Sequence, residues 1–284
     1  MRVLADSLDI SERMDQRRSA QALANLYFDL LGAVSPSLFI EVGARDAAVS
    51  LRVRELLPGA RIVAFEPSPF NVAYFKSQFD YEGSGIEYEQ LALAESPGKL
   101  RLYVPRSVGG KELPAKNGLS SLLKRASVDT VYDEVEVSAV TLDNFFPAST
   151  SQGCCVWIDV EGASGKVISG GQRLLGQTQL LMIEVEDRVV WHEQWLAGDV
   201  LKFLSAVKLV PVARDFQWWP DNYNIVCVRQ DLLDRTEIRF AIDRFYRGAN
   251  NKWRTWKEKA LSGKLLKISR KARNLVLRAL RYPN

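Results

Sequence analysis

The sequence is poor in the residues that most often build metal and redox sites. It has one histidine and three cysteines in 284 residues, and no Cys-x-x-Cys pair or Cys/His cluster of the kind that binds zinc. Cys154 and Cys155 are adjacent in an apolar run, where neighbouring strand residues point to opposite faces, so they are poorly placed to bond each other. With Cys227, they are interpreted as buried thiols of a reducing compartment.

Long apolar runs are also absent. No stretch reaches the eighteen or more apolar residues needed to cross a bilayer, and the first twenty residues have no apolar core of signal-peptide length. We therefore expect a cytoplasmic location. The composition, 47% hydrophobic and 25% charged, is typical of a folded chain rather than a disordered one.

Acidic residues are nearly missing from the C-terminal segment. Residues 248–284 contain eleven lysines and arginines and one acid, Glu258, so this segment carries +10 and the rest −6 of the net +4. Apolar residues recur every three or four positions after Trp253 and Trp256, which predicts a basic amphipathic helical tail over 250–281. Such a tail could lie on the cytoplasmic face of an anionic membrane, pack on the body, form a homodimer contact or bind RNA, the least favoured option.

Strand-like and helix-like segments alternate along the rest of the chain. Helices are expected over 11–31 (capped by Ser11), 46–57, 70–79 (starting at Ser68 or Pro69), 163–175 and 196–207, with a short turn or helix over 141–146. Strands are expected over 38–42, 61–65, 86–92, 99–104, 134–140, 154–160 and 180–185, with a hairpin of 209–213 and 224–228, and a polar loop over 109–117.

This alternation predicts an α/β fold with a mostly parallel sheet covered by helices on both faces. We expect a helical segment over 1–36, one α/β domain over 37–230 and the basic tail over 231–284. Parallel sheets bind ligands beyond the carboxyl ends of their strands, where the strand order reverses. The strand ends are therefore the places to look for chemistry.

Two strand ends favour a ligand that contains adenosine. The first strand runs into Gly43 and Ala44, which would bring bare backbone close to a ligand. The second ends at Glu66, followed by Pro67 and Ser68. An acid about 20 residues after such a glycine can accept hydrogen bonds from ribose hydroxyls.

The glycine pattern separates the two common adenosine cofactors. A dinucleotide pyrophosphate requires Gly-x-Gly-x-x-Gly, whereas Gly43 is followed by Ala44, Arg45 and Asp46, and Asp46 would repel a pyrophosphate. S-adenosylmethionine has no phosphate, and its amino cation suits an acid such as Glu41 or Asp46. An ordinary strand–turn–helix with a surface acid would have the same pattern.

Further short motifs follow in a set order. They are Ile-Glu-Val-Gly-Ala (40–44), Ala-Phe-Glu-Pro-Ser-Pro (64–69), Ala-Leu-Ala-Glu (92–95), Leu-Ser-Ser-Leu (119–122), Val-Thr-Leu-Asp (140–143), Ile-Asp-Val-Glu-Gly (158–162) and Ile-Glu-Val (183–185). Together they resemble the FkbM family of methyltransferases over about residues 38–228. The resemblance implies a class I methyltransferase fold and O-methylation by S-adenosylmethionine, often of sugars in glycans, glycolipids or polyketide products.

The resemblance also implies roles for individual residues. Gly43 and Ala44 would line the cofactor turn, Glu66 would hold the ribose, and Ala92 or its neighbours would flank the adenine. The family commonly has Asp where Glu41 stands and Ala-Asn-x-Gly where this chain has residues 44–47. Arg45 is therefore a candidate to bind the methionine carboxylate as a bidentate fork.

Four acids at the ends of two neighbouring strands are candidates for the chemistry: Asp159, Glu161, Glu184 and Glu186. Residues two apart on a strand share a face, so Asp159 and Glu161 could point together. Paired carboxylates could share a proton or hold a divalent cation that polarises a hydroxyl. We expect Asp159 nearest the cofactor's methyl group and Glu161 next to it. The alternative for Glu161 is to cap the following helix, and Glu184 and Glu186 are candidates to contact the acceptor.

Three further residues are candidates for the acceptor site. If the base is a histidine, it must be His192, although a lone histidine between tryptophans is also typical of packing. Trp218 and Trp219 lie in the predicted hairpin loop, where exposed aromatic faces suit sugar rings. They could equally be core residues.

The favoured hypothesis is an S-adenosylmethionine-dependent O-methyltransferase acting on a sugar hydroxyl of a glycan, polysaccharide or glycolipid. One alternative is a non-catalytic binding module with this fold at a membrane. Another is a nucleic-acid or protein methyltransferase, which is less favoured because the chain has no Asn-Pro-Pro-Tyr or Asp-Pro-Pro-Tyr run.

Overall fold

The computed structural model describes residues 12–126, 129–149, 153–217 and 222–247. Contacts within the chain group it into two units, Met1–Ile242 and Asp243–Asn284. Of the second unit, residues 243–247 are described and are helical. The predicted tail lies mostly outside the described residues, as do Ser11, Trp218 and Trp219.

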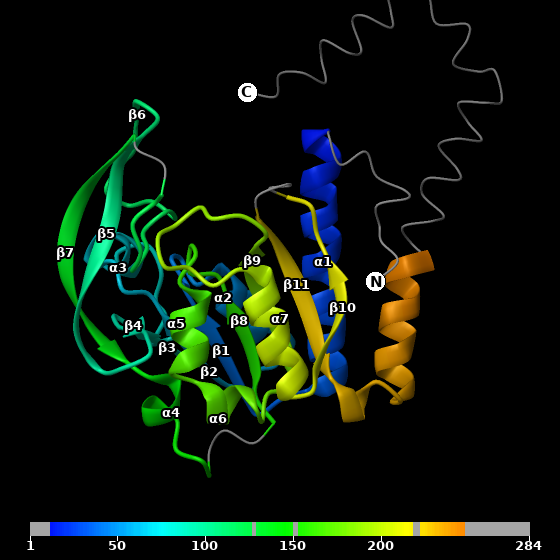
Figure 1. The fold of residues 1–284 in the computed structure, drawn as a ribbon. Helices are drawn as coiled ribbons and strands as arrows, with labels where there is room; N and C mark the ends of the chain where they lie inside the picture. The colour runs from blue at the N-terminus through cyan, green and yellow to red at the C-terminus, as the bar shows by residue number, and fades with distance from the viewer. Residues whose placement is uncertain (1–11, 127–128, 150–152, 218–221, 248–284) are drawn as a thin grey trace, which may run out of the picture. The chain divides into compact units, whose positions relative to one another are not determined.

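The first unit is built on a seven-stranded sheet with the order β10-β11-β9-β8-β1-β2-β3 (Figure 1). β11 runs antiparallel to both of its neighbours, and the other pairings are parallel. This order confirms the predicted α/β, class I methyltransferase-like fold with a mostly parallel sheet. The strands are β1 Leu38–Val42, β2 Arg61–Phe65, β3 Ile86–Glu89, β8 Cys155–Ile158, β9 Leu180–Glu186, β10 Leu209–Arg214 and β11 Asn222–Arg229.

Helices cover both faces of this sheet. On one face, α1 contacts β9, β10 and β11, and α2 contacts β1, β2 and β3. On the other face, α5 and α7 contact β9. The apolar run of β1 is buried throughout, as expected for a central parallel strand. The helices are α1 Arg13–Val34, α2 Ala48–Leu56, α3 Pro69–Lys76, α4 Leu142–Phe145, α5 Ser164–Ser169, α6 Gln172–Leu175 and α7 Ala197–Ala206, followed by the 3-10 turn η2 Gln230–Leu232 and a helix over 236–247.

The N-terminal helix is a structural layer of the domain. The Tyr27 hydroxyl donates a hydrogen bond of 3.0 Å to the carbonyl oxygen of Val156 on β8, and the Tyr27 ring packs edge-on against Trp157 with centroids 5.1 Å apart. Val156 and Trp157 both belong to β8, in the central part of the sheet. The helix therefore supports, from behind, the strand that leads to Asp159.

A second sheet was not predicted. Its order is β4-β7-β5-β6, with β5 and β7 as a long antiparallel pair that stands beside the main sheet (Figure 1). The strand predicted over 86–92 is wrong in extent, because the chain leaves the main sheet after Glu89 and enters the second one. The predicted polar loop over 109–117 likewise contains β6. The strands are β4 Ala92–Leu93, β5 Gly98–Val108, β6 Lys111–Glu112 and β7 Thr130–Val140.

The helix predicted over 163–175 is divided into α5 and α6. The division falls at Gly170 and Gly171, where the second sheet approaches the chain. A β-carbon on Gly170 would lie 2.0 Å from the carbonyl oxygen of Ala94. This close approach requires glycine at that position, and two adjacent glycines do not favour a continuous helix.

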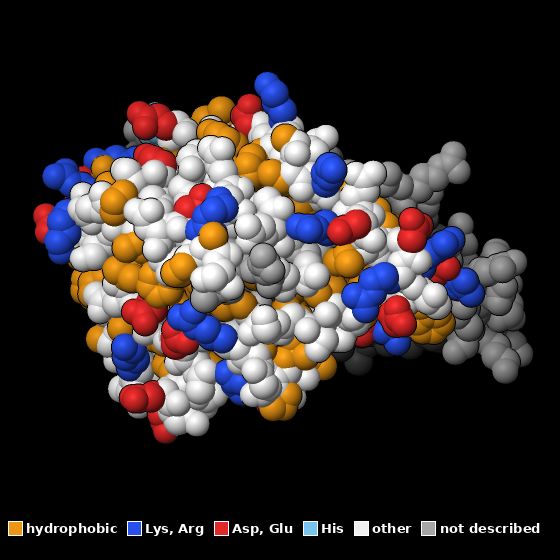
Figure 2. Space-filling view, turned by 90° about the horizontal axis from the view of Figure 1, so that it is seen from below, with side chains coloured by type: hydrophobic (Ala, Val, Ile, Leu, Met, Phe, Trp, Pro, Cys, Tyr) orange, Lys and Arg blue, Asp and Glu red, His pale blue; other side chains and the backbone are white. Residues whose placement is uncertain are grey.

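The described surface has two further properties. None of the described helices is long and apolar enough to cross a bilayer. On the face shown in Figure 2, acidic and basic side chains are interspersed with apolar ones, and neither charge gathers into one patch. Some charged side chains of the described surface form ion pairs, such as Arg61 and Glu87 at 2.7 Å.

Candidate active site

A cavity of about 320 Å³ opens at the carboxyl ends of β1, β2 and β8. This is where the strand order reverses between β1 and β8, the place that ligands occupy in such sheets. The residues that line it from the predicted cofactor set are Glu41, Gly43, Ala44, Arg45, Asp46, Glu66, Pro67, Ala92 and Asp159. Ser68 is buried next to this set as the N-cap of α3, accepting from the amide of Asn71.

Gly43 forms the tight turn at the end of β1. Its φ is +82°, and a β-carbon there would lie 1.8 Å from the carbonyl oxygen of Asp159. The amides of Gly43 and Ala44 donate hydrogen bonds of 3.0 and 2.8 Å to the carbonyl oxygen of Phe65 at the end of β2. Glycine is therefore required by the approach of the neighbouring strand as well as by its backbone conformation.

Glu66 lies at the end of β2, and its carboxylate accepts three hydrogen bonds from the chain. Its Oε1 accepts from the amide of Ser68 at 2.9 Å and from Nδ2 of Asn71 at 3.1 Å, and its Oε2 accepts from the amide of Arg45 at 2.9 Å. Burial raises the pKa of Glu66, while the bonds from Ser68 and Arg45 oppose that rise. These contacts hold the carboxylate rigidly at the cavity wall, where it can accept further hydrogen bonds from ribose hydroxyls.

The turn after Gly43 is fixed from outside by two tyrosines. The hydroxyls of Tyr81 and Tyr88 donate to the carbonyl oxygens of Asp46 and Arg45, and the two rings stack with centroids 4.4 Å apart. Arg45 and Ala47 both have positive φ, 47° and 50°. The tyrosines thus stabilise a turn that its own residues disfavour.

The side chain of Arg45 extends toward α3. Its guanidinium carbon lies 5.5 Å from the ring centroid of Phe75, although the residue also lines the cavity. The predicted contact of this group with a methionine carboxylate stays a prediction.

Glu41 joins β1 to α2. Its Oε2 accepts hydrogen bonds from the amide of Ser50 at 2.8 Å and from the Ser50 hydroxyl at 2.5 Å. Burial raises the pKa of Glu41 to about 8, and the two bonds from Ser50 act against this rise. The carboxyl group borders the cavity, where a ligand's cation would favour its ionised form.

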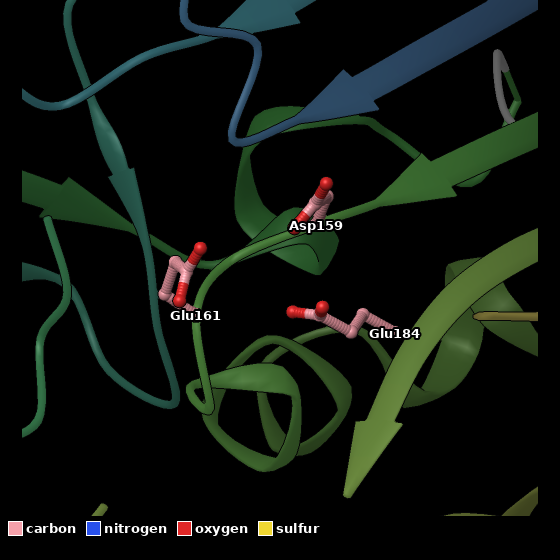
Figure 3. A group of neighbouring side chains, drawn as sticks. All are labelled: Asp159, Glu161 and Glu184. Carbon is pink, nitrogen blue, oxygen red and sulfur yellow. The ribbon is translucent and has the colours of Figure 1, made fainter. Parts of the chain in front are cut away.

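The predicted acids come together beside the cavity. The side-chain oxygens of Asp159, Glu161 and Glu184 all lie within 4.8 Å of one another and point into a shared space (Figure 3). Asp159 and Glu161 follow β8, and Glu184 projects from β9. Asp159 and Glu161 also line the cavity, whereas Glu184 lies beside it, so this acidic trio borders the cavity.

The trio and its neighbour Glu186 perturb one another. Burial raises the pKa of Glu161 to about 8, with the charge of Asp159 adding to the rise and Arg125 opposing it. Burial and then Asp159 raise the pKa of Glu186 to about 7. Burial also raises the pKa of Glu184 well above its ordinary value, with smaller effects from the other acids. Such perturbed carboxyls in a cleft indicate a functional site.

Glu161 is held by its backbone rather than by capping a helix. It has a positive φ of 49°, and its carbonyl oxygen accepts a 2.7 Å hydrogen bond from the hydroxyl of Ser121. The next residue, Gly162, packs so closely on Trp191 that a β-carbon would lie 2.6 Å from its ring. The side chain of Glu161 is thereby left to face the acids and Arg125.

A segment that sequence reasoning did not assign to the site crosses the cavity. Residues 117–126 contribute Asn117, Gly118, Ser120, Ser121 and Leu122 to its lining. The segment bridges to the second sheet through Ser121 and Tyr103, and to the loop after β9 through an isolated bridge of Arg125 with Trp191. The Leu-Ser-Ser-Leu motif is the signal that could have located it.

The remaining predicted residues lie elsewhere. His192 is exposed and does not line the cavity, and its amide donates to the carbonyl oxygen of Lys124. Trp218 and Trp219 lie outside the described residues. Glu184 and Glu186 are buried beside the cavity without lining it.

The cavity's chemistry suits S-adenosylmethionine. Glu66 contributes a carboxylate to its wall, and Leu91, Ala92 and Leu102 contribute apolar surface; the predicted contacts of Glu66 with a ribose and of Ala92 with an adenine stay predictions. Ser120 Oγ and Asn71 Oδ1 are buried without a hydrogen-bond partner among the described residues, although both residues line the cavity. A polar ligand would satisfy them.

Comparison with known proteins gives a consistent result. Residues 41–211 match the family model described as the methyltransferase FkbM domain. The 2-O-methyltransferase NoeI of Sinorhizobium fredii (strain NBRC 101917 / NGR234) is 22% identical over 182 residues, which cover 61% of this chain and 73% of that protein. Methyltransferase sdnD of Sordaria araneosa is 25% identical over 228 residues, covering 72% of this chain and 85% of that protein.

Solved structures show only distant likeness. The methyltransferase FkbM from Methylobacillus flagellatus KT is 11% identical with a TM-score of 0.41, and the match covers 67% of this chain and 44% of that one, less than half its length. Magnesium protoporphyrin IX methyltransferase (ChlM) from Synechocystis PCC 6803, solved with bound SAM, is 12% identical with a TM-score of 0.41, covering 78% of this chain and 83% of that one.

The family model spans more than half of the 284 residues and includes both the Glu66 strand end and the acidic trio. The chain therefore belongs to the FkbM family and is an S-adenosylmethionine-dependent methyltransferase.

Proposed function

We propose that this methyltransferase methylates a sugar hydroxyl of a glycan, polysaccharide or glycolipid. The observation that carries the proposal is the position of Asp159, which lines the cofactor cavity and belongs to the acidic trio. A hydroxyl acceptor must lose a proton as it is methylated, so it needs a carboxylate or a cation beside the methyl donor. The trio offers oxygen acceptors at this position.

Bound S-adenosylmethionine would supply a methyl group already activated by its sulfonium. The chain's own contribution is alignment and proton transfer. Asp159 would receive the acceptor's proton, since its side chain is open to solvent within the cavity. Glu161 lies beside it to share that proton, and Glu184 completes the wall of the acceptor site.

Two observations support an oxygen acceptor. The relative NoeI carries the name 2-O-methyltransferase, and the motifs of this chain resemble a family in which sugar hydroxyls are common acceptors.

Methyl transfer from radiolabelled S-adenosylmethionine to a panel of mono- and oligosaccharides tests this function. We expect label in at least one sugar, and we expect Asp159→Asn to reduce kcat by roughly 10²-fold or more, the usual range for a lost acid–base group. Asp133→Asn removes an exposed acid on β7 and serves as the matched control. Label that enters only RNA or protein, or an unchanged rate in Asp159→Asn, would refute the proposal.

We also propose a cytoplasmic enzyme whose tail over 250–281 attaches it to an anionic membrane. The support is the charge asymmetry of the chain, and a lipid-borne glycan would then be close at hand. Cosedimentation with anionic liposomes should pellet the full chain and not a chain truncated after Arg247. Equal pelleting of both would favour a tail that packs on the body or forms a dimer.

A further inference from the structure

The acidic trio contains oxygen atoms that the chain leaves without donors. Glu184 is 5% exposed; its Oε1 accepts a 2.8 Å hydrogen bond from Nδ2 of Asn222, whereas its Oε2 has no partner among the described residues. Figure 3 shows this carboxylate directed at Asp159 and Glu161. Buried acceptors without donors are rare in folded proteins, because each loses the hydrogen bonds it made to water.

Two neighbouring residues, Glu186 and Asn222, also have buried oxygen atoms without a donor. Glu186 is 1% exposed and its Oε1 has no partner within the described chain. Oδ1 of Asn222 is also buried and unpaired in that part of the chain, because the amide uses its nitrogen to bind Glu184. The unsatisfied atoms of Glu184, Glu186 and Asn222 are all oxygen acceptors, so these three residues lack a cation or a set of donors, whereas Nε of Arg125, the arginine that faces Glu161, is a buried donor without a partner in the described chain.

The chain supplies little positive charge here. In the described residues, the trio makes one ion pair, between Nη2 of Arg125 and Oε2 of Glu161 at 3.8 Å. The same guanidinium lies 5.1 Å from the ring centroid of Trp191. One arginine at that distance does not balance three clustered carboxylates, of which Glu184 is buried and Glu161 partly buried, and charge placed away from water without compensation is costly.

We propose that Asp159, Glu161 and Glu184 bind a divalent cation of the Mg²⁺, Mn²⁺ or Ca²⁺ class. These ions prefer carboxylate, carbonyl and water oxygens. Ca²⁺ holds its ligands at about 2.3–2.6 Å, so ligands on opposite sides of the ion lie about 5 Å apart. The trio's oxygens, all within 4.8 Å of one another, therefore fit one coordination shell.

Three protein ligands leave coordination positions open. The next step rests on the proposed sugar methylation. Because Asp159 lines the cofactor cavity, an open position on the ion would face that cavity and could take the acceptor's hydroxyl oxygen. The cation would hold that oxygen in line with the methyl donor and lower the pKa of the hydroxyl, whose proton would pass to the oxygen of Asp159 that is not bound to the ion. A sugar with two adjacent hydroxyls would be favoured, because both oxygens can bind one ion.

Direct cation binding tests the site without any acceptor. The full-length protein, first stripped with chelator, is titrated with Mn²⁺ and the free ion is followed by electron paramagnetic resonance. We expect about one ion per chain with a Kd at or below ~1 mM, the weak end for carboxylate sites. Glu184→Gln and Asp159→Asn should each weaken binding at least tenfold, whereas Glu134→Gln, which removes an acid on β7, should not.

The outcomes separate this inference from the proposed function. Absence of Mn²⁺ binding by folded wild type, or unchanged affinity in Asp159→Asn, would overturn the cation site even if S-adenosylmethionine binds the same sample. Mn²⁺ binding that depends on the trio would support it even if no sugar is methylated. Should Glu184→Gln fail to fold by circular dichroism, Asp159→Asn decides, because its side chain is exposed.

Discussion

The α-carbon of Gly43 and the carbonyl oxygen of Asp159 are so close that a β-carbon on the glycine would lie 1.8 Å from that oxygen. The two residues directly follow the adjacent strands β1 and β8, and the amide of Asp159 donates a 2.9 Å hydrogen bond to the carbonyl oxygen of Val42. The cofactor turn and the first acid of the trio are thus one mechanical unit, and a change in either should affect both.

Gly43→Ala should therefore destabilise the fold and displace Asp159. The positive φ and the overlap together should lower the free energy of unfolding by about 2–4 kcal/mol, measured by urea denaturation. Gly59→Ala is the matched control, because nothing lies within 4 Å of its β-carbon position. Equal stability of the two variants would show that the strand ends are further apart than described.

Glu66→Gln should weaken the binding of S-adenosylmethionine. One carboxylate oxygen becomes an NH2 group that cannot accept a hydrogen bond, so the bond from either the Ser68 amide or the Arg45 amide is lost, together with the negative charge of the carboxylate. We expect at least a tenfold increase in Kd, equivalent to ~1.4 kcal/mol, by isothermal titration calorimetry. Glu89→Gln, which changes an acid at the end of the next strand outside the cavity, should bind normally. An unchanged Kd in Glu66→Gln would exclude this carboxylate from the cofactor site.

Glu41 should make the stability of the cofactor-free protein depend on pH. Its pKa is raised from 4.5 to about 8 on folding, so the folded state binds the proton more tightly than the unfolded state. This contribution to stability is fully present below pH 4.5 and is lost as pH rises toward 8. The loss is on the order of 5 kcal/mol at most.

Glu41→Gln is neutral at every pH and should remove this dependence. Urea denaturation at pH 5 and pH 8 should show wild type losing stability relative to the variant. Glu55→Gln, an exposed acid on α2, should behave as wild type. Parallel pH profiles for wild type and Glu41→Gln would mean that Glu41 is ionised in the folded protein.

Tyr88→Phe should loosen the turn over residues 44–47. The variant loses the hydroxyl that donates to the carbonyl oxygen of Arg45, which should cost about 1 kcal/mol of stability and weaken cofactor binding several-fold. Thermal unfolding and calorimetric titration measure the two effects. Tyr74→Phe, on the partly exposed surface of α3, is the control. Full cofactor affinity in Tyr88→Phe would show that the turn holds its shape without this bond.

Local pattern alone determined the central strands and the residues at their ends. The apolar runs of β1, β2, β8 and β9 favour buried strands, and turn residues such as Gly43 and Pro67 mark where strands end. The positions of Glu66, Asp159 and Glu184 could therefore be predicted from the sequence. The N-terminal helix and the β10–β11 hairpin followed from the same periodicities. Parallel strands bring their carboxyl ends together, which is why the trio was expected.

Only the tertiary structure decided what crosses those ends. The second sheet, the division at Gly170 and the passage of residues 117–126 over the cavity depend on contacts between segments far apart in the chain. The carbonyl oxygen of Ala94 and the ring of Trp191 are examples. The exposure of His192 and the unpaired oxygen of Glu184 are of the same kind, since burial and hydrogen bonding are properties of the packed chain. Sequence pattern records which residues prefer to be buried, whereas packing determines which groups meet.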